Sequence, residues 1–207
     1  MSDNGWLILR RSYCELFTSR TFSHVIYVDQ APLQNYLSDW GAEYGNRGLN
    51  NPQALAGLQE TLESDPATAH RGTIAACLGY RWQPHPGEPG PDSAEWREDE
   101  AFFLGEALMG DGWWYGKLMA DHTALDWRDA IRQSFQPGSG SMTKTLVVAS
   151  TRSGCFPPEG PLKVVELANG GLEGGLARGV AVEWGGHWCY WEKPEKFNEM
   201  VLEFLAE

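Results

Sequence analysis

Three short apolar runs constrain the fold of this chain most strongly, because each is rich in β-branched residues and too short for a buried helix. They span residues 23–28, 145–150 and 179–184. Such runs are typical of parallel strands that are covered by helices on both faces. Helix-like segments flank them at residues 6–18, 161–168 and 194–206. The sequence therefore predicts an α/β fold with about three parallel strands, fewer than the roughly five or more of an ordinary open sheet.

The long segment between the first two strands has a mainly helical pattern. Pro52 and Pro66 suit the first turns of two helices, and two more helices are expected at residues 94–108 and 125–133. The proline-rich stretch 82–91 indicates a loop. An insertion of this size within one sheet predicts a helical cap. The predicted boundaries place residues 33–135 in the cap, and residues 1–32 and 136–207 in the α/β core.

Two polar side chains stand where predicted strands end. Asp29 follows the first strand directly, and His187 follows the third strand after two glycines. The carboxyl ends of parallel strands meet at one edge of the sheet, where α/β proteins place their sites. A carboxylate there can fix the imidazole tautomer and stabilise the imidazolium. We expect Asp29 and His187 to be catalytic; the alternatives are that Asp29 caps a turn and that His187 is structural.

The charge of the chain argues against nucleic acid and anionic membranes as partners. It carries 28 Asp and Glu against 16 Lys and Arg, a net charge of −12, and no basic cluster. No stretch approaches the roughly 20 apolar residues of a membrane span, and the first residues lack the basic start of a secretion signal. We expect a cytoplasmic protein with a small-molecule substrate, able to self-associate through its incomplete sheet.

The cysteines at positions 14, 77, 155 and 189 show no metal-ligand spacing, which predicts free thiols, no metal and no cofactor. Cys14 and Cys189 are conceivable nucleophiles, and Cys189 lies two residues after His187. Neither has a basic neighbour in the sequence that would activate the thiol, so we expect both to be structural.

Most of the ten tryptophans lie in the predicted cap. Buried aromatic side chains either hold the cap on the sheet or line an apolar pocket, and one set of residues can do both. Trp127 and Trp188 are the two that we expect to contact the substrate.

Four segments, in this order, resemble the α/β-hydrolase superfamily: residues 23–32, 119–128, 156–160 and the Gly-Gly-His-Trp segment around His187. The resemblance covers roughly residues 6–207. It implies a partial α/β-hydrolase fold with a cap inserted between the first two strands of this chain. It also implies a serine-type hydrolase that acts on small ester-like or other apolar substrates.

Members of that superfamily use a serine on a Gly-x-Ser-x-Gly elbow, then an acid, then a histidine. The acid usually follows the strand that residues 145–150 match, but the turn after that strand holds no carboxylate. Some members place the acid after the preceding strand, where Asp29 stands. The resemblance thus implies Asp29 as the acid and His187 as the base, with Asp121, Asp126 and Glu159 as weaker candidates for the acid.

The resemblance puts the nucleophilic serine near Asn4, where this chain has none. Ser2 lacks the flanking glycines, and Ser12 falls inside a predicted helix. We therefore expect the elbow to lie outside this chain, which alone would be nearly inactive. The alternatives are a non-catalytic truncated product and a module that only binds a ligand.

Overall fold

A computed structural model describes residues 19–207, and its centre is a parallel sheet with the strand order β1-β2-β3. Val25 lies opposite Thr145, and Val148 lies opposite Val180. The strands are β1 (His24–Val28), β2 (Lys144–Ser150) and β3 (Ala177–Val182). The predicted fold class is confirmed, although β3 begins and ends two residues before the predicted run. The predicted helix at residues 6–18, and Ser2, Asn4, Ser12 and Cys14, lie outside the described residues.

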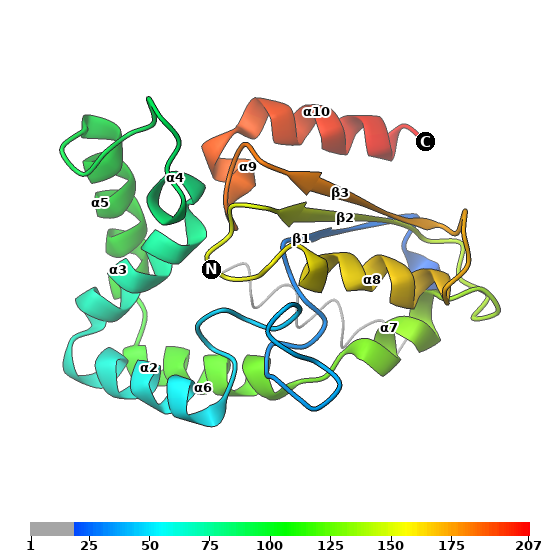
Figure 1. Cartoon of the computed structure of the whole chain (residues 1–207), viewed down its shortest axis with the longest axis horizontal. Helices are drawn as coiled ribbons and strands as arrows, with labels where there is room; N and C mark the ends of the chain where they lie inside the picture. Colours follow the sequence, from blue (N-terminus) through cyan, green and yellow to red (C-terminus); the bar gives the residue numbers. More distant parts are fainter. Residues whose placement is uncertain (1–18) are drawn as a thin grey trace.

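Side chains alternate between the two faces of this sheet, as a pleated strand requires. Tyr27 and Val147 pack with α7 and α8 in one core cluster. Leu146 and Val148 point to the opposite face and pack with Phe204 of α10. Figure 1 shows the sheet between these helices. The covering helices are α7 (Arg128–Phe135), α8 (Glu159–Asn169), α9 (Cys189–Glu192) and α10 (Pro194–Leu205).

A second group of helices lies beyond the carboxyl ends of the strands (Figure 1). Asn51 and Asp65 cap two of these helices by accepting the backbone N–H groups of Ala54 and Thr68. The group comprises α2 (Pro52–Ser64), α3 (Pro66–Cys77), α4 (Gly79–Trp82), α5 (Ala94–Leu108) and α6 (Gly112–Ala124). By contrast α7, which falls within the predicted cap range, packs in the core cluster under the sheet.

The helix α6 was not predicted from the sequence pattern. The helix contains Gly112 in its first turn and Gly116 one turn later, although glycine is among the poorest helix formers. Both glycines instead allow close packing on α2, because a Cβ on Gly112 would lie 2.7 Å from the carbonyl oxygen of Leu62. The Gln59 amide also donates to the Gly116 carbonyl oxygen at 3.0 Å. Contacts with α2 therefore stabilise a helix that the local sequence disfavours.

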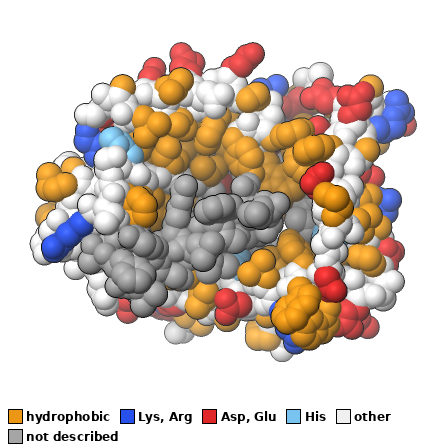
Figure 2. All heavy atoms as spheres, turned by 180° about the vertical axis from the view of Figure 1, so that it is seen from behind, with side chains coloured by type: hydrophobic (Ala, Val, Ile, Leu, Met, Phe, Trp, Pro, Cys, Tyr) orange, Lys and Arg blue, Asp and Glu red, His pale blue; other side chains and the backbone are white. Residues whose placement is uncertain are grey.

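Within residues 19–207, β1 has a neighbouring strand on one side only. Its residues Ile26 and Val28 are only partly buried, and Figure 2 shows hydrophobic side chains gathered on the face seen from behind. A strand edge with unpaired backbone groups can pair with another chain. We therefore still expect self-association, and sedimentation at increasing protein concentration would measure it. None of the described helices is both long and apolar enough to cross a membrane.

Candidate active site

Asp29 stands immediately after β1 and is fully buried. Its backbone adopts a positive φ of 45°, a conformation that Asp and Asn tolerate better than most residues. Its N–H donates to the Val148 carbonyl oxygen at 2.6 Å, and its Oδ1 accepts the N–H of Ser150 at 2.8 Å. These bonds fix the carboxylate at the carboxyl end of the sheet.

Ser150, the last residue of β2, connects the ends of all three strands. Its N–H binds Asp29 after β1, and its hydroxyl donates to the carbonyl oxygen of Gly185 after β3 at 2.5 Å. The same hydroxyl oxygen accepts the N–H of Arg152 at 2.9 Å. Because Ser150 is fully buried, this network holds the loops after β1, β2 and β3 in one fixed arrangement.

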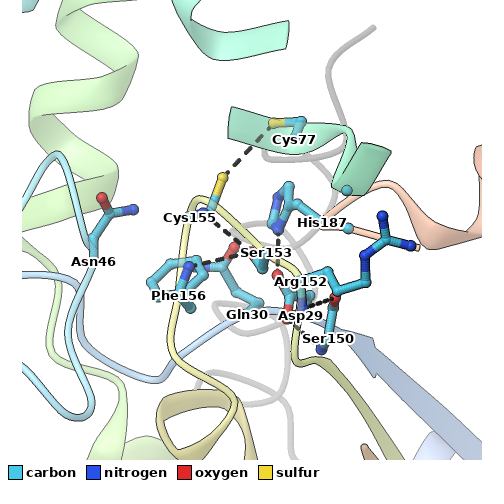
Figure 3. A network of polar contacts seen from close by, with 12 residues as sticks. Asp29, Gln30, Asn46, Cys77, Ser150, Arg152, Ser153, Cys155, Phe156 and His187 are labelled. Atoms are coloured by element: carbon cyan, nitrogen blue, oxygen red, sulfur yellow. Dashed lines mark hydrogen bonds and ion pairs between the residues drawn. The ribbon is translucent and has the colours of Figure 1, made fainter. Parts of the chain in front are cut away.

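The Oδ2 atom of Asp29 lies 2.9 Å from Nδ1 of His187. This distance falls within the 2.6–3.2 Å range expected for a working acid–base pair. The His187 side chain is 14% exposed, so the pair joins a buried carboxylate to a ring that solvent can reach. Figure 3 shows the ring between this carboxylate and two cysteine sulfurs.

Asp29, rather than the three weaker candidates, is thus the carboxylate that contacts His187. Asp126 is bound to the Arg128 guanidinium at 2.7 Å. Glu159 is an exposed residue at the start of α8, and Asp121 is exposed on α6.

Glu192 of α9 holds the loop that carries His187, a role that sequence reasoning missed. Its carboxylate accepts the N–H groups of Gly186, Gly79 and Tyr80 at 2.5, 2.9 and 3.3 Å. A Cβ on Gly79 would lie 2.6 Å from the Gly186 nitrogen, so only glycine allows this approach. Burial raises the pKa of Glu192, and the three N–H bonds oppose that shift. Glu192 therefore ties the His187 loop to α4 in the second group of helices.

Replacing Glu192 by glutamine is expected to lower the free energy of unfolding by about 1–3 kcal/mol, because both carboxyl oxygens accept backbone N–H groups and the amide NH₂ that replaces one of them cannot accept. The raised pKa means that the folded state binds the Glu192 proton more tightly than the unfolded state does. This contribution to stability is fully present below the ordinary pKa of 4.5 and is lost as the pH rises through the raised pKa.

Urea unfolding at a series of pH values measures this effect. The Glu192→Gln variant lacks the pH-dependent contribution, so the difference from the wild type should narrow as the pH rises. Glu199→Gln, on an exposed position of α10, is the matched control and should change stability little. A difference that stays constant with pH would contradict the raised pKa of Glu192.

Cys77 and Cys155 also reach the site, although the sequence pattern did not single them out. Their sulfurs lie 3.7 Å apart, and with a ring nitrogen of His187 they form a group of three ligand atoms within 4.8 Å of one another. Burial raises the pKa of Cys77, whereas the hydrogen bond from Cys77 and the charge of His187 lower the pKa of Cys155. Either sulfur can donate its S–H to the other.

The third described cysteine has a different environment. Cys189 is fully buried with Phe204 on the α10 face of the sheet, and burial raises the pKa of its thiol to about 12. A thiol of this kind is not a nucleophile at neutral pH.

The two tryptophans predicted to bind substrate lie in different surroundings. Trp188 stacks on Phe103 of α5 with ring centroids 4.3 Å apart, next to the His187 loop. The backbone N–H of Trp188 donates to the Cys77 carbonyl oxygen at 3.0 Å. Trp127 is 5% exposed and lies in the core cluster with Tyr27 and Ile131.

The geometry supports one chemical step directly. With Nδ1–H of His187 donating to Asp29, the lone pair for proton transfer is on Nε2. A buried carboxylate stabilises the imidazolium that forms when Nε2 accepts a proton. The pair is therefore suited to general acid–base catalysis at the carboxyl edge of the sheet.

No family model matches the chain, and no curated protein matches it. Several solved structures do match the chain. An esterase from Exiguobacterium antarcticum superposes with a TM-score of 0.73 at 15% identity, covering 96% of this chain and 63% of its own. A bromoperoxidase from Bacillus anthracis gives a TM-score of 0.72 at 12% identity, covering 96% of this chain and 63% of its own.

An enol-lactonase from Burkholderia xenovorans gives a TM-score of 0.63 at 15% identity, covering 96% of this chain and 62% of its own. The chain thus spans less than two thirds of the length of each of these structures. At such low identities the likeness concerns the fold. Together with the three parallel strands and their flanking helices, it shows that this chain has a partial α/β-hydrolase fold.

Proposed function

We propose that this chain is part of a serine-type hydrolase that cleaves small ester-like or other apolar substrates. His187 is the general base, and Asp29 orients it. The observation that carries the proposal is the 2.9 Å contact between a fully buried carboxylate and a histidine at the carboxyl ends of parallel strands. Similar structures described as an esterase and an enol-lactonase support this reaction class.

In this mechanism a serine hydroxyl attacks the acyl carbon while Nε2 of His187 takes its proton. The ester C–O bond then breaks, and the proton passes from Nε2 to the leaving alcohol oxygen. Water repeats the two steps and releases the acid, returning His187 to its neutral form. Asp29 stays ionised throughout and holds the Nδ1–H tautomer.

The nucleophile is the part of the proposal that rests on a segment outside this chain. The 207-residue sequence holds no Gly-x-Ser-x-Gly motif. Among the serines at the described strand ends, Ser150 is fully buried and donates to Gly185, and the Ser153 oxygen accepts the N–H groups of Cys155 and Phe156. We propose that an upstream segment supplies the elbow and the oxyanion-hole donors.

Aromatic side chains around the His187 loop and α9 support the apolar character of the proposed substrate. Phe103 stacks on Trp188, and Phe102 stacks on Trp191 with centroids 4.9 Å apart. Trp188 is our candidate for substrate contact, whereas the burial of Trp127 supports a packing role. A cytoplasmic location also belongs to the proposal, and the free thiols of the three described cysteines support it.

Hydrolysis of an activated aryl ester tests the proposal. The 207-residue chain is expected to hydrolyse it scarcely faster than buffer, because the chain holds no serine elbow and a general base contributes its roughly 10²–10⁴-fold only when the substrate is well positioned. A longer protein that includes an upstream elbow is expected to turn over. If the longer protein binds the ester but does not cleave it, the ligand-binding module is the better description. Strong activity of residues 1–207 that Ser2→Ala removes would place the nucleophile at Ser2.

A further inference from the structure

Three metal-ligating side chains converge from separate parts of the chain. Cys77 is the last residue of α3, Cys155 lies in the loop after β2, and His187 lies in the loop after β3. One ligand atom of each lies within 4.8 Å of the other two. Figure 3 shows both sulfurs on one side of the His187 ring and Asp29 on the other.

The distance between the sulfurs suits a shared metal ion. Two thiolates bound at about 2.3 Å in a tetrahedral zinc site are about 3.8 Å apart. The Cys77 and Cys155 sulfurs are 3.7 Å apart. A disulfide would require about 2.05 Å, so the two side chains would have to move to form one, whereas a metal ion would fit between them as they stand.

The histidine is already oriented as metal-binding histidines usually are. In most such sites one ring nitrogen donates to a carboxylate while the other binds the metal. Here Nδ1 donates to the Asp29 carboxylate at 2.9 Å, so Nε2 would be the ligand. Asp29 thus fixes the tautomer that coordination needs.

The surrounding charge favours a cation. The buried Asp29 carboxylate lies 2.9 Å from Nδ1 of His187, and the Glu192 carboxylate accepts the N–H of Gly79, two residues after Cys77, so both place negative charge near the ligand atoms. Thiolates are the form of cysteine that binds metal, so both thiols give up their protons when an ion binds. Cys155 and His187 are partly exposed, which gives an ion a path from solvent.

We propose that Cys77, Cys155 and His187 bind a thiophilic divalent ion of the Zn²⁺ type, with the fourth position taken by water or another group. Binding forms two metal–sulfur bonds and one metal–Nε2 bond, and the protons of both thiols leave to solvent. The ion would occupy the nitrogen on which general-base action depends. It would also connect α3 of the cap to two loops of the core. The binding itself does not depend on the proposed hydrolase activity.

Cobalt provides the test, because thiolate-bound Co²⁺ gives a ligand-to-metal absorption band that does not depend on activity. The full 207-residue chain, kept reduced and free of oxygen, is titrated with Co²⁺ and then with Zn²⁺. We expect a band that saturates at one Co²⁺ per chain and disappears when Zn²⁺ displaces it. Binding should weaken as the pH falls, because protons compete for the sulfurs.

The variants Cys77→Ser and Cys155→Ser should each raise the dissociation constant of Co²⁺. The increase should be at least roughly 10- to 100-fold, which is the cost of losing a residue that only supports a metal ligand. Cys189→Ser, which changes a buried thiol outside the cluster, is the matched control and should keep the band. Circular dichroism verifies that each variant is folded, and Zn²⁺ should raise the melting temperature of the wild type and the control only.

Two results would overturn the proposal. The first is the absence of a cobalt band in folded protein whose thiols a titration has shown to be free. The second is a band that persists in both Cys77→Ser and Cys155→Ser. Either result would leave the esterase proposal unaffected, since that proposal is tested by turnover of the longer protein.

Discussion

Replacing His187 by alanine in a longer protein that carries the elbow is expected to lower kcat by about 10⁶-fold, the loss seen when the base of a complete triad is removed. The reason is that Nε2 of His187 both takes the serine proton and returns it to the leaving group. Without it the serine hydroxyl remains a weak nucleophile. KM should change little, because no part of the imidazole is needed to hold an apolar substrate. Steady-state hydrolysis of an aryl ester measures both constants.

His85→Ala is the matched control, because His85 is an exposed histidine in the loop between α4 and α5. It should retain wild-type kcat. In the 207-residue chain itself, His187→Ala should alter the small background rate hardly at all. A loss of less than about tenfold in the longer protein would mean that another group accepts the proton, and His187 would then be structural.

The sheet could be predicted from the sequence because its three strands lie in mainly apolar runs, a pattern typical of parallel strands, and β2 is buried along almost its whole length. The end of β3 could not be predicted in this way. The mainly apolar run of the sequence continues through Glu183 to Trp184, whereas pairing with β2 ends at Val182. Helix α6 was missed because packing of Gly112 against Leu62 stabilises it, and no local signal records that contact.

The pairing of Asp29 with His187 could be predicted because both residues directly follow strands, and parallel strands bring their carboxyl ends to one edge. Glu192 and the two cysteines could not be predicted in the same way. Glu192 acts through backbone N–H groups of Gly79 and Gly186, which have no side-chain signature. Cys77 and Cys155 are 78 positions apart, so no spacing rule connects them.

Replacing Asp29 by asparagine is expected to lower kcat by about 10⁴-fold in the longer protein, with the fold retained. Asparagine tolerates the positive φ at this position as aspartate does. Its single oxygen is needed by the Ser150 N–H, which Oδ1 of Asp29 now accepts at 2.8 Å. The amide nitrogen would then face Nδ1 of His187 as a donor, and the ring would have to carry its proton on Nε2. That tautomer cannot accept the serine proton.

Asp126→Asn is the matched control, since Asp126 is an exposed acid bound to Arg128 and was a weaker candidate for the same role. It should keep kcat near the wild-type value. The pH dependence separates a catalytic role from a structural one: without the carboxylate the imidazolium is less stabilised, so the acid limb of the kcat profile of Asp29→Asn should move to lower pH. If Asp126→Asn instead causes the large loss while Asp29→Asn does not, the acid is Asp126, and the contact between Asp29 and His187 serves only to position the loop after β3.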